Sequence, residues 1–177
     1  MHLRRVVTGQ AADGRSVFVS DDVVHPVTLA AMPGAEFHRI WGSDQVVELP
    51  SNGTTPTAPD YFPPVGGFRL ALYTFGPNGA APPADLDHEA AIAEIRRKLP
   101  GILEVREVDQ PRMHTTDTVD VDVILAGEVW LELDDGAEVH LRTGDCVVQN
   151  GTRHAWHNRS SQPCTMLVAV IGAQRRR

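Results

Sequence analysis

Cysteine, long apolar runs and positive charge are all scarce in this chain of 177 residues. Two cysteines, Cys146 and Cys164, are too few for a disulfide framework, and their valine- and leucine-containing surroundings predict two reduced, buried thiols. No apolar run approaches the roughly 18 residues that a membrane span needs. The N-terminal segment has no long apolar stretch after its arginines, which argues against a signal peptide. We therefore expect a cytoplasmic protein.

The charge balance disfavours further classes of partner. Sixteen basic residues against 23 acidic ones give a formal net charge of −7, which is unfavourable for binding nucleic acid or an anionic membrane. The run of arginines at 175–177 is interpreted as a solvated end of the chain. Nothing resembles a nucleotide-binding loop, a nucleophile elbow or a CxxC pair. These features disfavour a nucleic acid, a nucleotide or an anionic membrane as the partner of this chain.

What the chain does contain is a series of short strand-like segments. Strands are predicted within the first 48 residues in RRVVTG, RSVFVSDDVV, PVTLAAM and EFHRIWGS, and a further strand is predicted at residues 68–75. Residues 50–67 form a loop rich in proline and glycine, and Tyr61 and Phe62 indicate that it packs on the body of the protein. From residue 114 onward, strands follow at about 8–12-residue spacing with glycine-containing turns, which is typical of an all-β sandwich or barrel.

One helix interrupts this pattern, at residues 85–99. Asp85 or Asp87 can cap its start, Ile92, Ile95 and Leu99 share a stripe, and basic residues gather in its last turn. We interpret the helix as an insertion in a single domain over residues 1–177. N-terminal strands and the proline-rich loop would make up residues 1–67 of this domain, and residues 114–171 would form its core.

The segment HTTDTVDVDVILAG, residues 114–127, supports two opposite orientations. Successive side chains of a strand point to opposite faces, so the polar residues lie on one side and a valine row lies on the other. The polar side carries His114, Thr116, Thr118, Asp120 and Asp122. Burying the valine row would leave ordinary solvent-facing aspartates. Burying the polar side would direct His114 and Asp120 into the interior, where they would surround a bound group.

The segment TRHAWHN, residues 152–158, poses a similar question. Alternation places His154, Trp156 and Asn158 on one face, with His157 on the other. If His154 points inward, Trp156 lines an aromatic pocket of the kind that binds small molecules; otherwise its ring is part of the core. His157 is expected on the surface, or as a spare ligand if the strand is bulged.

These two segments resemble the two signature motifs of the cupin superfamily. In the first motif His114 matches the first histidine, Thr116 stands in the place of the second histidine, Asp120 stands in the place of the glutamate, and Gly127 matches the glycine. The second motif is matched at a larger set of positions: Gly144, Asp145, Gly151, His154 and Asn158, with Gln149 in the place of the proline. The resemblance covers residues 114 to about 171.

The resemblance implies a jelly-roll β-barrel whose polar row points inward. A metal ion held by His114, Asp120 and His154 would then lie between the two motif strands, with Thr116, Thr118 and Trp156 shaping a substrate pocket. Two imidazoles and one carboxylate suit Fe(II), and also Mn, Ni, Co or Zn less selectively. The missing second histidine and the replacement of glutamate by aspartate put metal binding in question. We assign no catalytic residue at this stage.

Two classes of function remain open. The first is a metal-dependent enzyme acting on a small organic molecule, with oxygenase, decarboxylase, isomerase and dehydratase chemistry unresolved, because the fold does not select among them. The second is a metal-free binding or sensor module with the same barrel. A homodimer is expected in either case, because the edges of an open sheet need covering. Arg69 can bind a substrate carboxylate if its strand face looks inward, and is otherwise a surface residue. His38 and His140 are expected to be bystanders.

Overall fold

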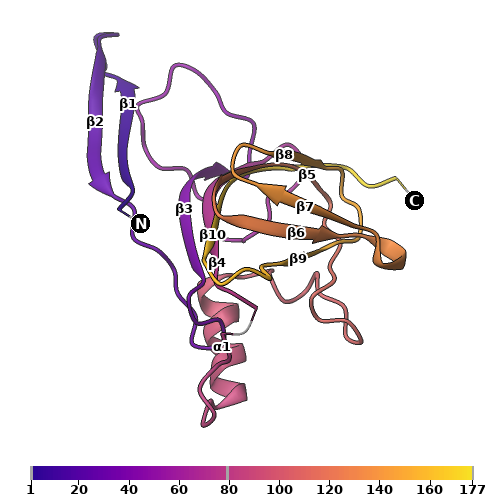
Figure 1. The fold of residues 1–177 in the computed structure, drawn as a ribbon. Helices are drawn as coiled ribbons and strands as arrows, with labels where there is room; N and C mark the ends of the chain where they lie inside the picture. Colours follow the sequence, from indigo (N-terminus) through magenta and orange to yellow (C-terminus); the bar gives the residue numbers. More distant parts are fainter. Residues whose placement is uncertain (1, 79, 177) are drawn as a thin grey trace.

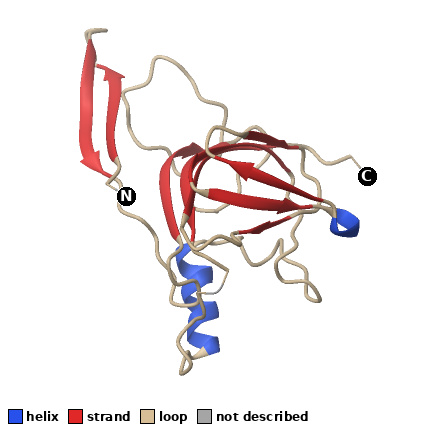
Figure 2. Ribbon diagram, in the orientation of Figure 1, coloured by secondary structure: helices blue, strands red, loops and turns tan. Residues whose placement is uncertain are grey.

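The computed structural model describes residues 2–78 and 80–176, in which the strands form two sheets and a separate hairpin (Figure 1; Figure 2). The larger sheet, in spatial order, contains β3 (Glu36–Ser43), β4 (Phe68–Phe75), β10 (Cys164–Gly172), β5 (Thr118–Ala126) and β8 (Cys146–Gln149). The smaller sheet contains β7 (Glu138–Arg142), β6 (Glu128–Glu132) and β9 (Ala155–His157). All neighbouring strands are antiparallel. The all-β jelly-roll prediction is confirmed.

The core lies between the inner faces of the two sheets. Ile124 on β5 and Met166 on β10 are buried in one cluster with Val129 and Leu131 on β6 and Leu141 on β7. Alternation explains the selection, because every second residue of a strand points to the same side. Val129 is 0% exposed, and its neighbours on β6, Glu128 and Trp130, are only half-buried. Burial of such apolar faces from two layers is what stabilises this class of fold.

The turn between β5 and β6 needs its glycine. Gly127 has a φ of +77°, in the left-handed region that side chains other than glycine adopt with difficulty. A Cβ atom at this position would also lie 2.5 Å from the carbonyl oxygen of Pro163. The motif glycine is therefore required here both for the turn and for the close approach of a neighbouring segment.

The N-terminal strands lie apart from the two sheets. β1 (Arg4–Gln10) and β2 (Ser16–Val23) form a two-stranded hairpin, which projects beside β3 in Figure 1. Arg5 donates a hydrogen bond to the carbonyl of Ile40, which ties the hairpin to β3. The strand predicted at PVTLAAM is absent from the described chain, where only a single bridge joins Val27 to Phe37. Pro26 at its start and Pro33 at its end restrict this segment to a short extended piece.

The predicted helix is present and shorter than expected. α1 spans His88–Lys98, and the side chain of Asp87 caps it by accepting a hydrogen bond from the amide of Ala90. Ala91 is buried, and the predicted stripe residues Ile95 and Leu99 pack in or against the core. The third, Ile92, is 44% exposed, so the predicted apolar stripe holds at two of its three positions. Lys98 donates to the carbonyl of Thr28, which fixes the helix to the segment before β3. A single 3₁₀ turn, Asp134–Gly136, joins β6 to β7.

The structure corrects the expectation of two buried cysteines. Cys164, on the central strand β10, is buried, but Cys146 is exposed at the start of β8, an edge strand with a neighbour on only one side. Both thiols are free. Among the described residues, no helix has the length and apolar character needed to cross a membrane.

Candidate functional site

A cavity of about 390 Å³ opens between the sheets and the segments that precede β3 and β5. Its lining contains six aromatic side chains: Phe37, Tyr61, Phe62, Tyr73, Phe75 and Trp156. Its lining also contains six ionisable side chains: Arg106, Arg112, His114, Asp120, Asp122 and His154. A concave, mostly apolar cavity with a few convergent polar groups is the usual form of a small-molecule site.

Strand β5 turns its polar face into the protein. Asp120 is 7% exposed and Asp122 is 3% exposed, whereas Val119, Val121 and Val123 on the opposite face are only half-buried. The two carboxylates reach the cavity, and the valine row faces away from it. The orientation that buries the polar row is therefore the one that the structure adopts.

Two histidines from different segments meet at this cavity. His114 and His154 are joined by an isolated antiparallel bridge, with each amide bonded to the other's carbonyl at 3.0 Å, and their ring centroids lie 4.1 Å apart. The Nδ1 atom of His114 lies 3.3 Å from the carbonyl of Arg112, and Nδ1 of His154 lies 2.9 Å from the carbonyl of Thr152. A carbonyl oxygen can only accept, so each Nδ1 carries the hydrogen, and Nε2 retains its lone pair.

The imidazole rings of His114 and His154 are in the protonation state that can coordinate a metal ion. Burial, together with smaller effects of the nearby charges of His154 and Arg106, lowers the pKa of His114 to about 4. Burial also lowers the pKa of His154. Both imidazoles are therefore neutral near pH 7, which is the form that coordinates metal ions.

The buried carboxylates have the opposite shift. Burial raises the pKa of Asp120 to about 6, and burial together with the charge of Asp120 raises the pKa of Asp122 to about 7. The Oδ1 atom of Asp120 is buried without any hydrogen-bond partner in the part of the chain described. A buried carboxylate oxygen without a partner is costly, and a cation is one group that would satisfy it.

The remaining predicted pocket residues behave differently from one another. Trp156 lines the cavity as expected, with its ring edge-on to His154 at a centroid distance of 6.0 Å. Thr116 and Thr118 are buried and joined by a hydroxyl hydrogen bond of 2.8 Å, but neither lines the cavity. Their hydroxyls satisfy each other, and this pairing explains why the polar row tolerates burial at these positions.

Arg69 is neither a surface residue nor a cavity residue. It is 4% exposed and its guanidinium bonds to the carboxylate of Asp44 and to the carbonyls of Asp60 and Ser43. It therefore holds the loop after β3 and the proline-rich loop in place. Of the two positions left open for Arg69, the inward one is observed, and its guanidinium is bonded within the protein rather than directed at the cavity.

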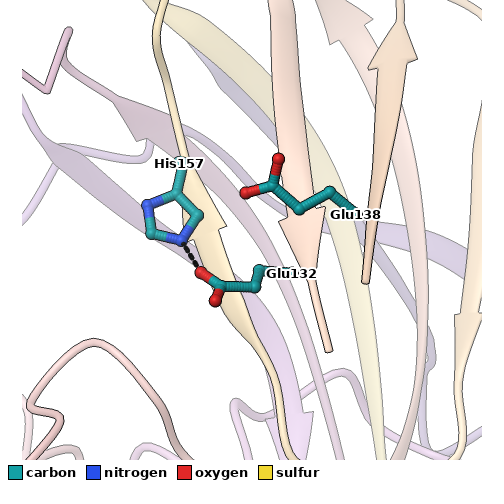
Figure 3. A group of neighbouring side chains, drawn as sticks. All are labelled: Glu132, Glu138 and His157. Atoms are coloured by element: carbon teal, nitrogen blue, oxygen red, sulfur yellow. Dashed lines mark hydrogen bonds and ion pairs between the residues drawn. The ribbon is translucent and has the colours of Figure 1, made fainter. Parts of the chain in front are cut away.

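His157 corrects a second expectation, because it is 8% exposed rather than on the surface. Its Nε2 atom lies 2.6 Å from a carboxylate oxygen of Glu132, and Arg112 donates to its Nδ1 atom at 3.2 Å. Figure 3 shows its ring directed toward Glu132, with Glu138 close by. Among the described residues, this outer cluster of Glu132, Glu138 and His157 is the group of three whose ligand atoms all lie within 4.8 Å of one another.

The outer cluster is already saturated with protein partners. His157 uses both ring nitrogens, and Glu138 forms hydrogen bonds and an ion pair with Arg159. A metal ion there would have to displace these contacts. The inner residues His114, His154 and Asp120 have free donor atoms instead, although these atoms do not all lie within 4.8 Å of one another. Two neutral imidazoles and an oxygen without a partner fit a divalent cation by their chemistry.

The sequence prediction missed several residues of the cavity. Asp122 shares the strand face of Asp120, so alternation alone could have identified it. Tyr61 and Tyr73 stack at a centroid distance of 5.6 Å in the cavity wall, and only the packing of the proline-rich loop was foreseen. Arg106 lies in an irregular segment where no periodicity could have indicated its direction.

Comparison with known proteins agrees with this geometry. Residues 102–170 match the family described as Cupin domain. The chain carries a cupin domain. The matched range includes both histidines, both aspartates and both arginines of the cavity, whereas the aromatic lining residues other than Trp156 come from residues before this range.

Individual relatives come from fungal gene clusters and from solved cupins. The chain is 36% identical over 130 residues to phomopsin biosynthesis cluster protein C' of Diaporthe leptostromiformis, covering 63% of this chain and 66% of that protein. It is 26% identical over 154 residues to the cupin-domain-containing oxidoreductase virC of Hypocrea virens, covering 87% of this chain and 66% of that protein. A Cupin 2 conserved barrel domain protein from Salinispora arenicola superposes with a TM-score of 0.41 at 15% identity, covering 82% of each chain. The chain spans 41–66% of the length of the three relatives from biosynthesis clusters.

Proposed function

We propose that this protein is a metal-dependent cupin enzyme that acts on a small organic molecule bound in the cavity. His114, His154 and Asp120 would hold the ion. The observation that carries the proposal is that both histidines are held in the same way for binding a ligand. Backbone carbonyls fix both Nδ1 atoms, both Nε2 lone pairs are left for a ligand, and Asp120 has, among the described residues, an oxygen without a partner in the same cavity.

The cavity residues have distinct tasks in this proposal. A bound ion would supply Lewis-acid polarisation of the substrate or a site for dioxygen. The aromatic wall would orient the substrate and exclude water from the reacting end. Asp122, beside Asp120 on β5, would hold or accept a proton at its carboxylate. Three relatives have names that call them oxidoreductases, which favours a redox reaction and therefore iron over Mn, Ni, Co or Zn.

A metal-free binding module is the second candidate. The observation that favours it is that the donor atoms of His114, His154 and Asp120 are not gathered within 4.8 Å of one another. Thr116, in the place of the second histidine of the cupin motif, is also turned to Thr118 and away from the cavity. Such a barrel would bind the same class of small molecule without chemistry.

Elemental analysis of untagged protein distinguishes the two candidates. We expect about one equivalent of a divalent transition metal in the wild type and almost none in His154→Ala. His157→Ala is the matched control, because it removes an imidazole three residues further along, on β9 and on the opposite face, and should leave the metal bound. Wild-type protein without metal, after growth in metal-supplemented medium, would leave the binding module as the function.

We also propose that the chain forms a homodimer through the outer face of strands β4, β10, β5 and β8 of the larger sheet. The strand register places only uncharged side chains on this face of β4, β10, β5 and β8: Phe68, Leu70, Leu72, Thr74, Thr165, Leu167, Ala169, Ile171, Val119, Val121, Val123, Val148 and Cys146. Ile171 is 48% exposed and Val148 is 57% exposed. A second copy presents the same uncharged face, so pairing about a two-fold axis buries no unpaired charge.

Light scattering after gel filtration tests the dimer. Val148→Asp places a charge on the paired face, at its β8 edge, and should give a monomer. Val139→Asp, which charges a similarly exposed valine on β7 of the other sheet, should leave the dimer intact. A wild type that elutes as a monomer at high concentration would contradict this proposal without affecting the metal site.

A further inference from the structure

Two arginines line the cavity without a carboxylate to neutralise them. Arg106 and Arg112 are both exposed at its lining. In the part of the chain described, the guanidinium of Arg106 bonds only to the carbonyl of Pro111, at 3.4 Å, and that of Arg112 bonds to Nδ1 of His157, at 3.2 Å. Neither contact offsets the positive charge.

Most other arginines of the described chain have acidic partners. Ion pairs with Asp or Glu are formed by Arg4, Arg5, Arg15, Arg69, Arg96, Arg153, Arg159 and Arg175. In a chain of net charge −7, carboxylates are in excess. Two guanidinium groups without an acidic partner therefore distinguish this cavity from most of the arginine-containing surface.

The backbone aligns Arg106 with the two histidines. One isolated antiparallel bridge pairs Arg106 with His114, and a second pairs His114 with His154. Directly opposite residues of antiparallel segments point to the same side, with Cβ atoms about 4.5–5.5 Å apart. Arg106, His114 and His154 thus form one row across three segments. An anionic group at Arg106 would lie next to the donor atoms that face the cavity.

We propose that the ligand of this cavity is a ring-containing carboxylate whose carboxylate group is bound by Arg106, with Arg112 supporting it. The inference rests on the proposed function, for which it names the substrate class. A guanidinium presents paired N–H donors that match the two oxygens of a carboxylate. The ring of the ligand then lies among the aromatic side chains, and its carboxylate end lies beside His114 and His154.

The shape of the cavity favours a ring. Tyr61 and Tyr73 are nearly parallel, at 15°, and Phe37 meets Tyr73 edge-on at a centroid distance of 5.5 Å. Such walls bind flat, apolar rings by offset and edge contacts. A volume of about 390 Å³ is near the lower limit for ligand pockets, which restricts the ligand to a small molecule.

The charge distribution also sets the orientation of the ligand. The carboxylates of Asp120 and Asp122 come from β5, whereas both arginines come from the irregular segment that precedes it. A carboxylate near the aspartates would be repelled, and one near Arg106 would be attracted. The ligand therefore binds with its charged end at the arginines and its ring toward the interior.

Paired binding measurements test this inference with benzoate, phenylacetate and cinnamate, each beside its neutral amide. Calorimetry on protein freed of metal with EDTA should show at least one acid binding ten- to a hundredfold more tightly than its amide. Arg106→Gln should bring that ratio close to one and leave the affinity for the amide unchanged within twofold. Arg97→Gln, which removes an exposed positive charge from α1, should leave the ratio intact.

The outcomes separate this inference from the metal proposal. If no acid binds better than its amide, or if Arg106→Gln weakens acid and amide equally, the carboxylate assignment is wrong. Because the protein is metal-free in this experiment, either result is independent of whether the wild type binds an ion. Loss of metal in His154→Ala, by contrast, reports only on the proposed function.

Discussion

The two sides of strand β9 and its approach carry histidines in opposite conditions. On the cavity side, His114 and His154 have one nitrogen each bonded to a backbone carbonyl, and Asp120 nearby has an oxygen without a partner. On the outer side, His157 has both nitrogens bonded, to Glu132 and Arg112. By the short distances between its donor atoms alone, the outer cluster would be the better metal site. The inner residues are the better candidates because their donor atoms have no protein partner among the described residues, whereas an ion at the outer cluster would have to displace existing contacts.

The largest expected effect comes from the buried carboxylates of the cavity, Asp120 and Asp122, in protein freed of metal. Because burial and Asp120 raise the pKa of folded Asp122 to about 7, its ionisation opposes folding as the pH rises from about 4 to about 7. Asp122→Asn in EDTA-treated protein should therefore increase the free energy of unfolding by about 2–4 kcal/mol at pH 8 and change it little at pH 3. Urea denaturation at the two pH values measures this. Equal effects at both would contradict it.

The second effect concerns the outer cluster. His157→Ala leaves the half-buried carboxylate of Glu132 and the guanidinium of Arg112 without their partner, so we expect a loss of about 1–3 kcal/mol in unfolding free energy. The metal content should stay at the wild-type level. Urea denaturation and elemental analysis on the same preparation check both parts. If the variant loses its metal, the roles of the inner and outer clusters are reversed.

The smallest effect is expected at Glu138. Its carboxylate pairs with Arg159 at the surface, and exposed ion pairs contribute little to stability. Glu138→Gln should leave the melting temperature and the metal content within experimental error of the wild type. A clear loss of metal would identify the outer cluster of Figure 3 as a real ion site.

Much of the fold could be predicted from local sequence. The strand at residues 68–75 and the series of strands after residue 117 follow from alternation and from glycine-containing turns, which act over a few residues. The cap of α1 at Asp87 was one of two local candidates. PVTLAAM failed as a strand because pairing requires a neighbour along its whole length, and it has only one bridge.

The candidate site was predictable only in part. The motif spacing indicated His114, Asp120 and His154, and all three line one cavity. Thr118 lies on the same face by alternation, and yet it does not line the cavity. Its hydroxyl donates instead to the hydroxyl of Thr116, two residues away. Arg69 was directed to the right side of its strand but taken up by Asp44 and loop carbonyls. Alternation assigns a face, but it does not assign a partner.

The sequence by itself determined the strands, their two-residue periodicity and the residues that could share a face. Only the tertiary structure decided which face of β5 is inside, because burial depends on the second sheet and on the segments packed against it. The row of Arg106, His114 and His154 is likewise a tertiary result. Its members are separated by 8 and 40 positions in the sequence, and backbone pairing between distant segments brings them together.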